Sequence, residues 1–176
     1  MSTLRVVPAV VALGLALGAC ADEPTLAPDT ARSVPGLADV WGPETPPFNL
    51  QVVLQDPAGG AGFGLVKFRQ TNDDELVITL DTWVRDLAPL TSYRLQRAVD
   101  VTLDGVCSSS AWLTLGAGLT PLAITTDETG TGSADLWRSV AAFPVGAAFD
   151  IHFQVIEDAT GAVVLASDCY RFVISQ

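Results

Sequence analysis

The stretch LVITLDTWV, residues 76–84, decides the fold class, because its side chains alternate between the two sides of an extended chain. One side carries Leu76, Ile78, Leu80, Thr82 and Val84, while Thr79, Asp81 and Trp83 fall on the other. A period of two predicts a β-strand with one buried face. Residues 48–55 repeat the pattern, with apolar side chains at 48, 50, 52 and 54.

The chain beyond these two segments reads as further short strands. They are FGLVKFRQ, SYRLQRAVDV, AWLTLG, LAITT, GSADLW, FDIHFQVIE, AVVLA and CYRFVIS, with turn signals such as DPAGGAG, TNDDE, DETGTG and DATGA between them. No segment shows helical periodicity. The spacing predicts an all-β domain over residues 48–176, an antiparallel β-sandwich of about 7–9 strands with immunoglobulin-like or Greek-key topology. Arg97 is out of character in its segment, since it falls in phase with the apolar residues.

The first 20 residues have the zones of an export signal: Arg5, an apolar run from Val6 to Leu17, and small residues at the end. The run is too short to span a bilayer comfortably, which takes about 20 residues.

The LGAC sequence at 17–20 resembles the lipobox of bacterial lipoproteins. That resemblance implies cleavage after residue 19, lipid on Cys20, and an exported, membrane-anchored protein. The alternative is an ordinary cleaved signal with a chance cysteine. Ala21, rather than an aspartate, favours the outer membrane if the cell is Gram-negative.

Residues 20–47 are predicted to be a lipidated tether. Residues 21–47 hold six prolines and five acidic residues, a composition that cannot build a packed core. Trp41 is the exception, and it is expected either to dock on the domain or to contact lipid.

The chain is strongly acidic, with 20 Asp and Glu against 9 Lys and Arg and a net charge of −11. Removing residues 1–19 removes only Arg5 among the charged residues, so the charge becomes −12. This charge argues against nucleic acid as a partner, because such binding needs patches of Lys and Arg.

Cys107 and Cys169 remain once Cys20 is assigned to lipid. In an oxidising compartment they are most simply a disulfide. Two free thiols or a metal pair are the alternatives, although no C-x-x-C motif or nearby histidine supports a metal.

Two short patterns resemble known sandwiches. LAPLTSYRL, residues 87–95, resembles the corner of fibronectin type III and other immunoglobulin-like domains, which implies that the Tyr93 hydroxyl bonds nearby backbone. The order of an early hairpin, a LAP corner, a loop cysteine, TTDETGTGSADL and a late cysteine is similar to copper-zinc superoxide dismutases. The metal site of that family needs several histidines, whereas this chain has only His152.

A recognition surface formed by Trp83, Arg85, Arg94 and Arg97 is predicted, because Trp83 falls on the polar side of its strand and a tryptophan flanked by arginines is typical of such surfaces. The same cluster extends to Trp112, Trp137 and Arg138. The alternative is that the tether or a long loop covers Trp83.

Function is predicted to be non-catalytic: a lipid-anchored envelope module that binds another envelope protein or a glycan, without cofactor or metal. The main ground is that no catalytic constellation is visible. A hydrolase or metal-dependent enzyme, with a site assembled from His152, Asp81, Asp104 and Asp150, is the first alternative. A purely structural envelope lipoprotein is the second.

Overall fold

The structure is a computed structural model, and it describes residues 48–70 and 75–175. The predicted signal peptide, Cys20 and the tether with Trp41 lie outside the described residues, as does most of the TNDDE turn.

Twelve β-strands make up the described part of the chain. They are β1 (Phe48–Gln55), β2 (Phe63–Gln70), β3 (Val77–Arg85), β4 (Ser92–Asp100), β5 (Leu113–Thr114), β6 (Gly116–Ala117), β7 (Thr120–Pro121), β8 (Ile124–Thr125), β9 (Gly132–Ser139), β10 (Ala148–Glu157), β11 (Val163–Ser167) and β12 (Tyr170–Val173). The predicted all-β class is confirmed. No helix long and apolar enough to cross a bilayer occurs within these residues.

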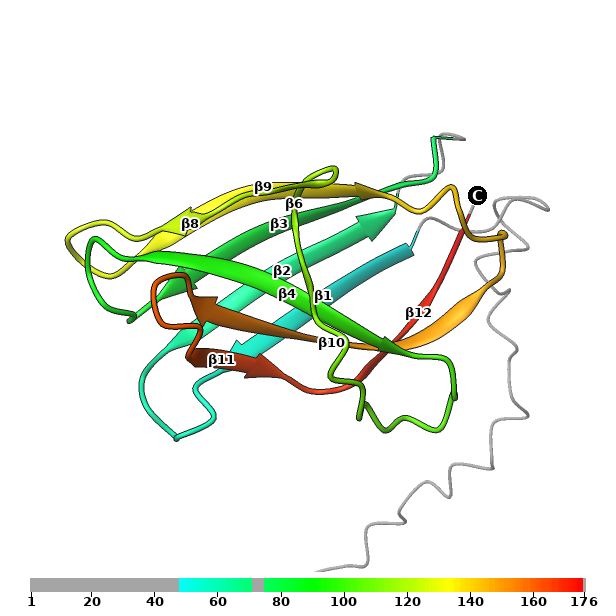
Figure 1. Cartoon of the computed structure of the whole chain (residues 1–176). Coiled ribbons are helices and arrows are strands. Elements are labelled where there is room, and N and C mark those ends of the chain that lie inside the picture. The colour runs from blue at the N-terminus through cyan, green and yellow to red at the C-terminus, as the bar shows by residue number, and fades with distance from the viewer. Residues whose placement is uncertain (1–47, 71–74, 176) are drawn as a thin grey trace, which may run out of the picture. The chain divides into compact units, whose positions relative to one another are not determined.

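The strands form a single hydrogen-bonded sheet in the order β5-β4-β10-β11-β1-β2-β3-β9-β6-β7, with β12 beside β10 and β8 beside β4. All pairs are antiparallel except β6 with β9. The sheet curls until its ends approach each other, because β8 pairs with β4 while the next residue, Thr126, bridges Gly132 of β9. The result is nearly a barrel, with β1, β2, β3 and β9 facing β4, β10, β11 and β12 (Figure 1). The two separate sheets and the 7–9 strands of the predicted sandwich are therefore not confirmed.

Alternating residues fill the space between the two walls, as the period of two predicts. In β3 the buried residues are Ile78, Leu80, Thr82 and Val84. Phe68 of β2 lies at the centre, with its ring 6.0 Å from that of Phe153 and 4.7 Å from that of Phe172. These contacts join the walls at the level of β10 and β12.

The curled sheet stays open along one line between β4 and β9. Short strands bridge the gap at two levels: β8 near Tyr93, and β5 with β6 near Arg97 and Trp137. Residues 98–100 of β4 pair only with β10, and residues 138–139 of β9 pair only with β3, among the described strands. We call this unbridged stretch the open seam.

The corner between β3 and β4 is docked on the turn between β8 and β9. Ala88 donates its backbone N–H to the Tyr93 hydroxyl oxygen at 3.1 Å, so the predicted contact forms, with the hydroxyl as acceptor. Thr126 donates its hydroxyl to the Ala88 carbonyl at 2.7 Å. Gly130 has φ +77°, and a Cβ there would lie 2.1 Å from the Leu87 carbonyl oxygen. Only glycine fits this close approach.

Candidate functional site

The four residues of the predicted recognition surface do not form one surface. Trp83 and Arg85 lie on the outer face of β3, where Trp83 contacts Phe63 and the Arg85 guanidinium lies 4.9 Å from the centre of the Phe63 ring. Arg94 is on β4, in the opposite wall, and forms a two-pronged ion pair with Asp158. Arg97, the fourth residue, points to the inside of the sheet.

The strand register shows why Arg97 faces inward. Directly opposed residues of an antiparallel pair place their side chains on the same face. Arg97 is opposite Phe153, a core residue that is 1% exposed. It also continues the inward phase of Tyr93 and Leu95, which are both buried. Arg97 therefore occupies an inward-facing position of β4, as its spacing from the apolar residues of the segment indicated.

Arg138 on β9 has the same orientation by the same reasoning. It is opposite Ile78, which is 5% exposed and belongs to the core. Its sequence neighbours at two residues' distance, Leu136 and Val140, are both buried. Arg138 also reaches the Gly118 carbonyl at 3.4 Å. Two arginines thus enter the interior from the strands on either side of the open seam.

A cavity of about 400 Å³ lies at this place, and we call it the end cavity. Most of its wall is apolar, and the charged groups in it are the two arginines; it is lined by Ile78, Arg97, Val99, Val101, Arg138, Ser139, Val140, Ala142, Phe143, Phe149, Ile151, Phe172 and Ile174. Val101 is 80% exposed and Phe143 is 42% exposed, so the rim of the cavity is apolar as well. Its size falls within the range of small-molecule sites, about 300–1,000 Å³.

The electrostatics of the end cavity are unusual for so acidic a chain. Burial lowers the pKa of the Arg97 guanidinium from its ordinary value, and the nearby positive charge of Arg138 lowers it further. Arginine nevertheless stays protonated at physiological pH. Neither guanidinium forms an ion pair within the described residues. The interior therefore holds two neighbouring positive charges without a described carboxylate to balance them.

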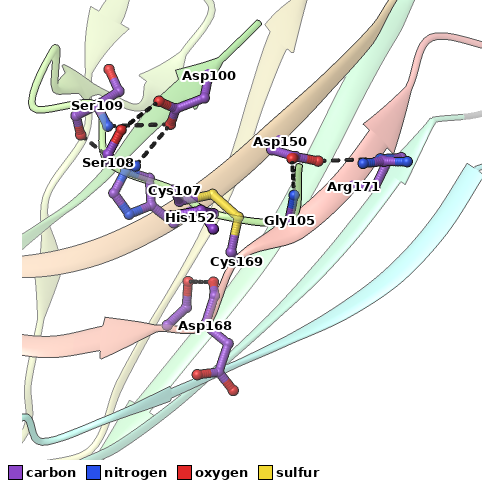
Figure 2. Close-up of a disulfide and its surroundings, with 12 residues drawn as sticks. Asp100, Gly105, Cys107, Ser108, Ser109, Asp150, His152, Asp168, Cys169 and Arg171 are labelled. Carbon is purple, nitrogen blue, oxygen red and sulfur yellow. Dashed lines mark hydrogen bonds and ion pairs between the residues drawn. A yellow bond between two sulfur atoms is a disulfide. The ribbon is translucent and has the colours of Figure 1, made fainter. Parts of the chain in front are cut away.

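A different set of residues fixes the loop between β4 and β5, residues 101–112, which we call the Cys107 loop. The Cys107–Cys169 disulfide is formed, as predicted, with 5.4 Å between the Cα atoms, and it ties this loop to the start of β12 (Figure 2). Asp150, which is 1% exposed, accepts the Gly105 N–H at 2.7 Å and pairs with Arg171 at 3.2 Å. The Gly105 N–H and the Arg171 guanidinium lower the pKa of Asp150, against the opposing effect of burial.

His152 is held by the same loop. Its Nε2 lies 3.1 Å from the Ser109 carbonyl, and its ring packs against Trp112 with 4.6 Å between the centroids. Asp100 accepts the backbone N–H groups of Ser108 and Ser109 (Figure 2). These polar groups hold the loop against the outer face of β10.

The four residues of the alternative enzymatic site take up separate structural contacts. Asp150 and His152 bind the Cys107 loop, and Asp104 accepts the N–H of Val106 at 2.9 Å. Asp81 lies on β3 and pairs with Arg69. In the described part of the chain, no three His, Cys, Asp or Glu side chains are grouped closely enough to hold a metal ion.

Comparisons with known proteins add no assignment: no protein-family model and no curated protein matches the chain. Function is therefore inferred from the residues of the end cavity. The sequence contained one signal for it, an arginine in the apolar phase of each of two strands, but not the fact that these strands flank the same opening.

Proposed function

We propose that this chain is a lipid-anchored envelope protein whose β-domain is a non-catalytic module that binds a small, largely apolar ligand in the end cavity. The observation that carries the proposal is the cavity itself. It is concave, of ligand size, mostly apolar, and provided with few polar groups, which is the usual constitution of a small-molecule site. Exposed apolar side chains at its rim, such as Val101 and Phe143, also mark a place of contact.

The proposed anchor suits such a ligand. Lipid on Cys20, expected from the lipobox, would hold the domain near a membrane, where apolar compounds concentrate. The described chain begins at Phe48 of β1, at the same end of the sheet as the end of β4, the end of β9 and the start of β10 (Figure 1). The first described strand therefore begins at the end of the domain where the cavity opens.

The test is saturable binding of a neutral apolar dye, N-phenylnaphthylamine, to the chain from Ala21 onward. This form lacks lipid that would take up dye, and it keeps every strand and core residue of the described domain. We expect one dye per chain. Val99→Trp, which fills the cavity wall, should abolish binding, and so should Ala142→Trp at the exposed rim.

Val53→Trp is the matched control, because Val53 is 37% exposed on β1 and does not line the cavity. It should bind dye like the parent chain. Circular dichroism shows whether each variant is folded. Absence of dye binding by the parent, or unchanged binding by both a folded Val99→Trp and a folded Ala142→Trp, would refute the end cavity as a ligand site.

The anchor is tested separately on the full chain in the producing cell. The parent should incorporate radioactive palmitate and partition into the detergent phase, and Cys20→Ala should do neither. If Cys20→Ala still incorporates palmitate after its signal is removed, the lipoprotein assignment is wrong, whereas the ligand site is unaffected.

A further inference from the structure

We propose that the ligand of the end cavity is a single-chain amphiphile with an anionic head, a carboxylate or a phosphate, whose head is bound by Arg97 and Arg138 together. This inference rests on the proposed function and specifies the chemical class of the ligand. The apolar chain of the ligand would lie along the apolar wall, and the head would lie at the open seam.

The pairing of the other arginines is the first argument. Six arginines occur in the described part of the chain, and four of them, Arg69, Arg85, Arg94 and Arg171, form ion pairs with aspartates. Arg97 and Arg138 do not, although the chain has more than twice as many acidic as basic residues. Carboxylates are thus abundant in this chain, yet none of the described ones pairs with Arg97 or Arg138.

The energetics of that arrangement are the second argument. A charge taken out of water is costly unless it is paired, and two like charges side by side add repulsion. Arg97 is half-buried opposite Phe153, and the charge of Arg138 acts on it directly. An anion placed between the two guanidinium groups removes both costs. Unfavourable charge arrangements of this kind concentrate at functional sites.

The geometry of the guanidinium group is the third argument. Its planar fork of donors matches carboxylate and phosphate oxygens in two-pronged hydrogen bonds. Arg97 and Arg138 come from strands on opposite sides of the open seam, so they can approach one head from two directions. Neutral or cationic heads offer no such match.

The apolar wall determines the rest of the ligand. Val99, Phe149, Ile151, Phe172 and Ile174 supply a continuous hydrocarbon surface beside the arginines. Burying each CH₂ group against such a surface contributes about 0.8 kcal/mol. The volume of about 400 Å³ is near the lower limit of small-molecule sites, which favours one chain over two.

The experiment measures displacement of N-phenylnaphthylamine from the chain beginning at Ala21 by four probes with the same ten-carbon chain. They are decanoate, decyl phosphate, decanol and decyltrimethylammonium, each used below its micelle concentration at a pH where decanoate is ionised. We expect decanoate or decyl phosphate to bind at least about tenfold more tightly than decanol, and decyltrimethylammonium to bind most weakly. Comparison of the two anions shows which head is preferred.

Single substitutions test whether Arg97 and Arg138 cause the preference for anionic heads. Arg97→Gln and Arg138→Gln should each weaken the anions about tenfold or more while they leave dye and decanol nearly unchanged. Arg94→Gln is the matched control, since it removes the same charge from the outer face of the same strand and should keep the anion preference. Equal binding of anions and decanol, or an equal loss in Arg94→Gln, would overturn the inference but leave the proposed function intact. Failure of the dye to bind would refute the proposed function, and the inference with it.

Discussion

Arg97 of β4 and Arg138 of β9 line the same apolar cavity, although the two strands that carry them are not paired with each other at this level. The curl of the sheet brings them together across the open seam. Because both are charged and neither has a described carboxylate partner, we expect them to lower the stability of the fold. This relationship supports the proposal that the two arginines serve binding rather than stability.

Arg97→Met should therefore stabilise the protein. Methionine preserves the apolar stem and removes the buried charge and its repulsion with Arg138. We expect the free energy of unfolding in urea to rise by about 1 kcal/mol, a size common for stabilising substitutions. A loss of about 2 kcal/mol or more, typical of a truncated core residue, would instead assign Arg97 a structural role.

The sequence predicted the all-β class and the disulfide, but neither the single curled sheet nor the end cavity. Alternation in residues 76–84 correctly placed Ile78, Leu80 and Val84 in the core, because that pattern depends only on neighbours along one strand. The predicted segments AWLTLG and LAITT contain β5 and β8, whereas the two-residue strands β6 and β7 carry no periodicity and were not predicted. The pairing of β1 with β11, which joins the two walls into one sheet, connects residues more than 100 positions apart, and no local pattern specifies it.

Local sequence patterns also failed to predict which of the candidate residues lie together in the fold. Trp83, Arg85, Arg94 and Arg97 were grouped by residue type, but the walls that carry them face opposite directions. Arg138 belonged to the wider set for the same reason. The register shows that Arg97 and Arg138 point into the same interior, while Arg94 binds Asp158 outside.

Asp150→Asn should show a pH-dependent loss of stability. The Gly105 N–H and Arg171 hold the pKa of Asp150 below its unfolded value, so its carboxylate stabilises the fold above about pH 4. That contribution disappears as the pH falls through the lowered pKa. Urea unfolding should find Asp150→Asn less stable than the parent at pH 7, with the difference shrinking towards pH 2. A difference that is constant with pH would contradict this role.

Cys107 and Cys169 should resist alkylation in the native protein until it is reduced. The disulfide closes a loop with a sequence separation of 62, which in the chain-entropy model stabilises by about 4 kcal/mol. Replacing both cysteines by serine should lower the free energy of unfolding by about 2–5 kcal/mol. Two thiols that react at once in the untreated native domain would show that the bridge is absent in solution.

Tyr93→Phe tests the corner between β3 and β4. The substitution removes the oxygen that accepts the Ala88 N–H, and the ring stays buried, so we expect a loss of about 1–2 kcal/mol. Tyr170→Phe on β12 serves as a comparison, because its hydroxyl accepts the N–H of Val53 at an exposed position, where water can replace it. An equal and negligible effect of both changes would show that the hydrogen bond between Ala88 and Tyr93 does not stabilise the corner.

Gly130→Ala should be more damaging than Tyr93→Phe. The added Cβ would collide with the Leu87 carbonyl oxygen, and alanine disfavours the positive φ of this position. We expect a loss of more than about 2 kcal/mol in urea unfolding. Gly161→Ala, also at positive φ but with open space around it, should cost less. Equal losses would mean that the turn does not pack against the corner as described.

Binding of an anionic amphiphile in the end cavity is tested most directly by a two-dimensional amide NMR titration of the chain from Ala21 onward with decanoate. If the end cavity binds the amphiphile through the two arginines, saturable shifts should concentrate at Arg97, Val99, Arg138, Phe149 and Ile151. The outer face around Trp83 and Phe63 should stay unchanged. Saturable shifts confined to that outer face, or no shifts at all at millimolar decanoate, would show that the end cavity does not bind the amphiphile.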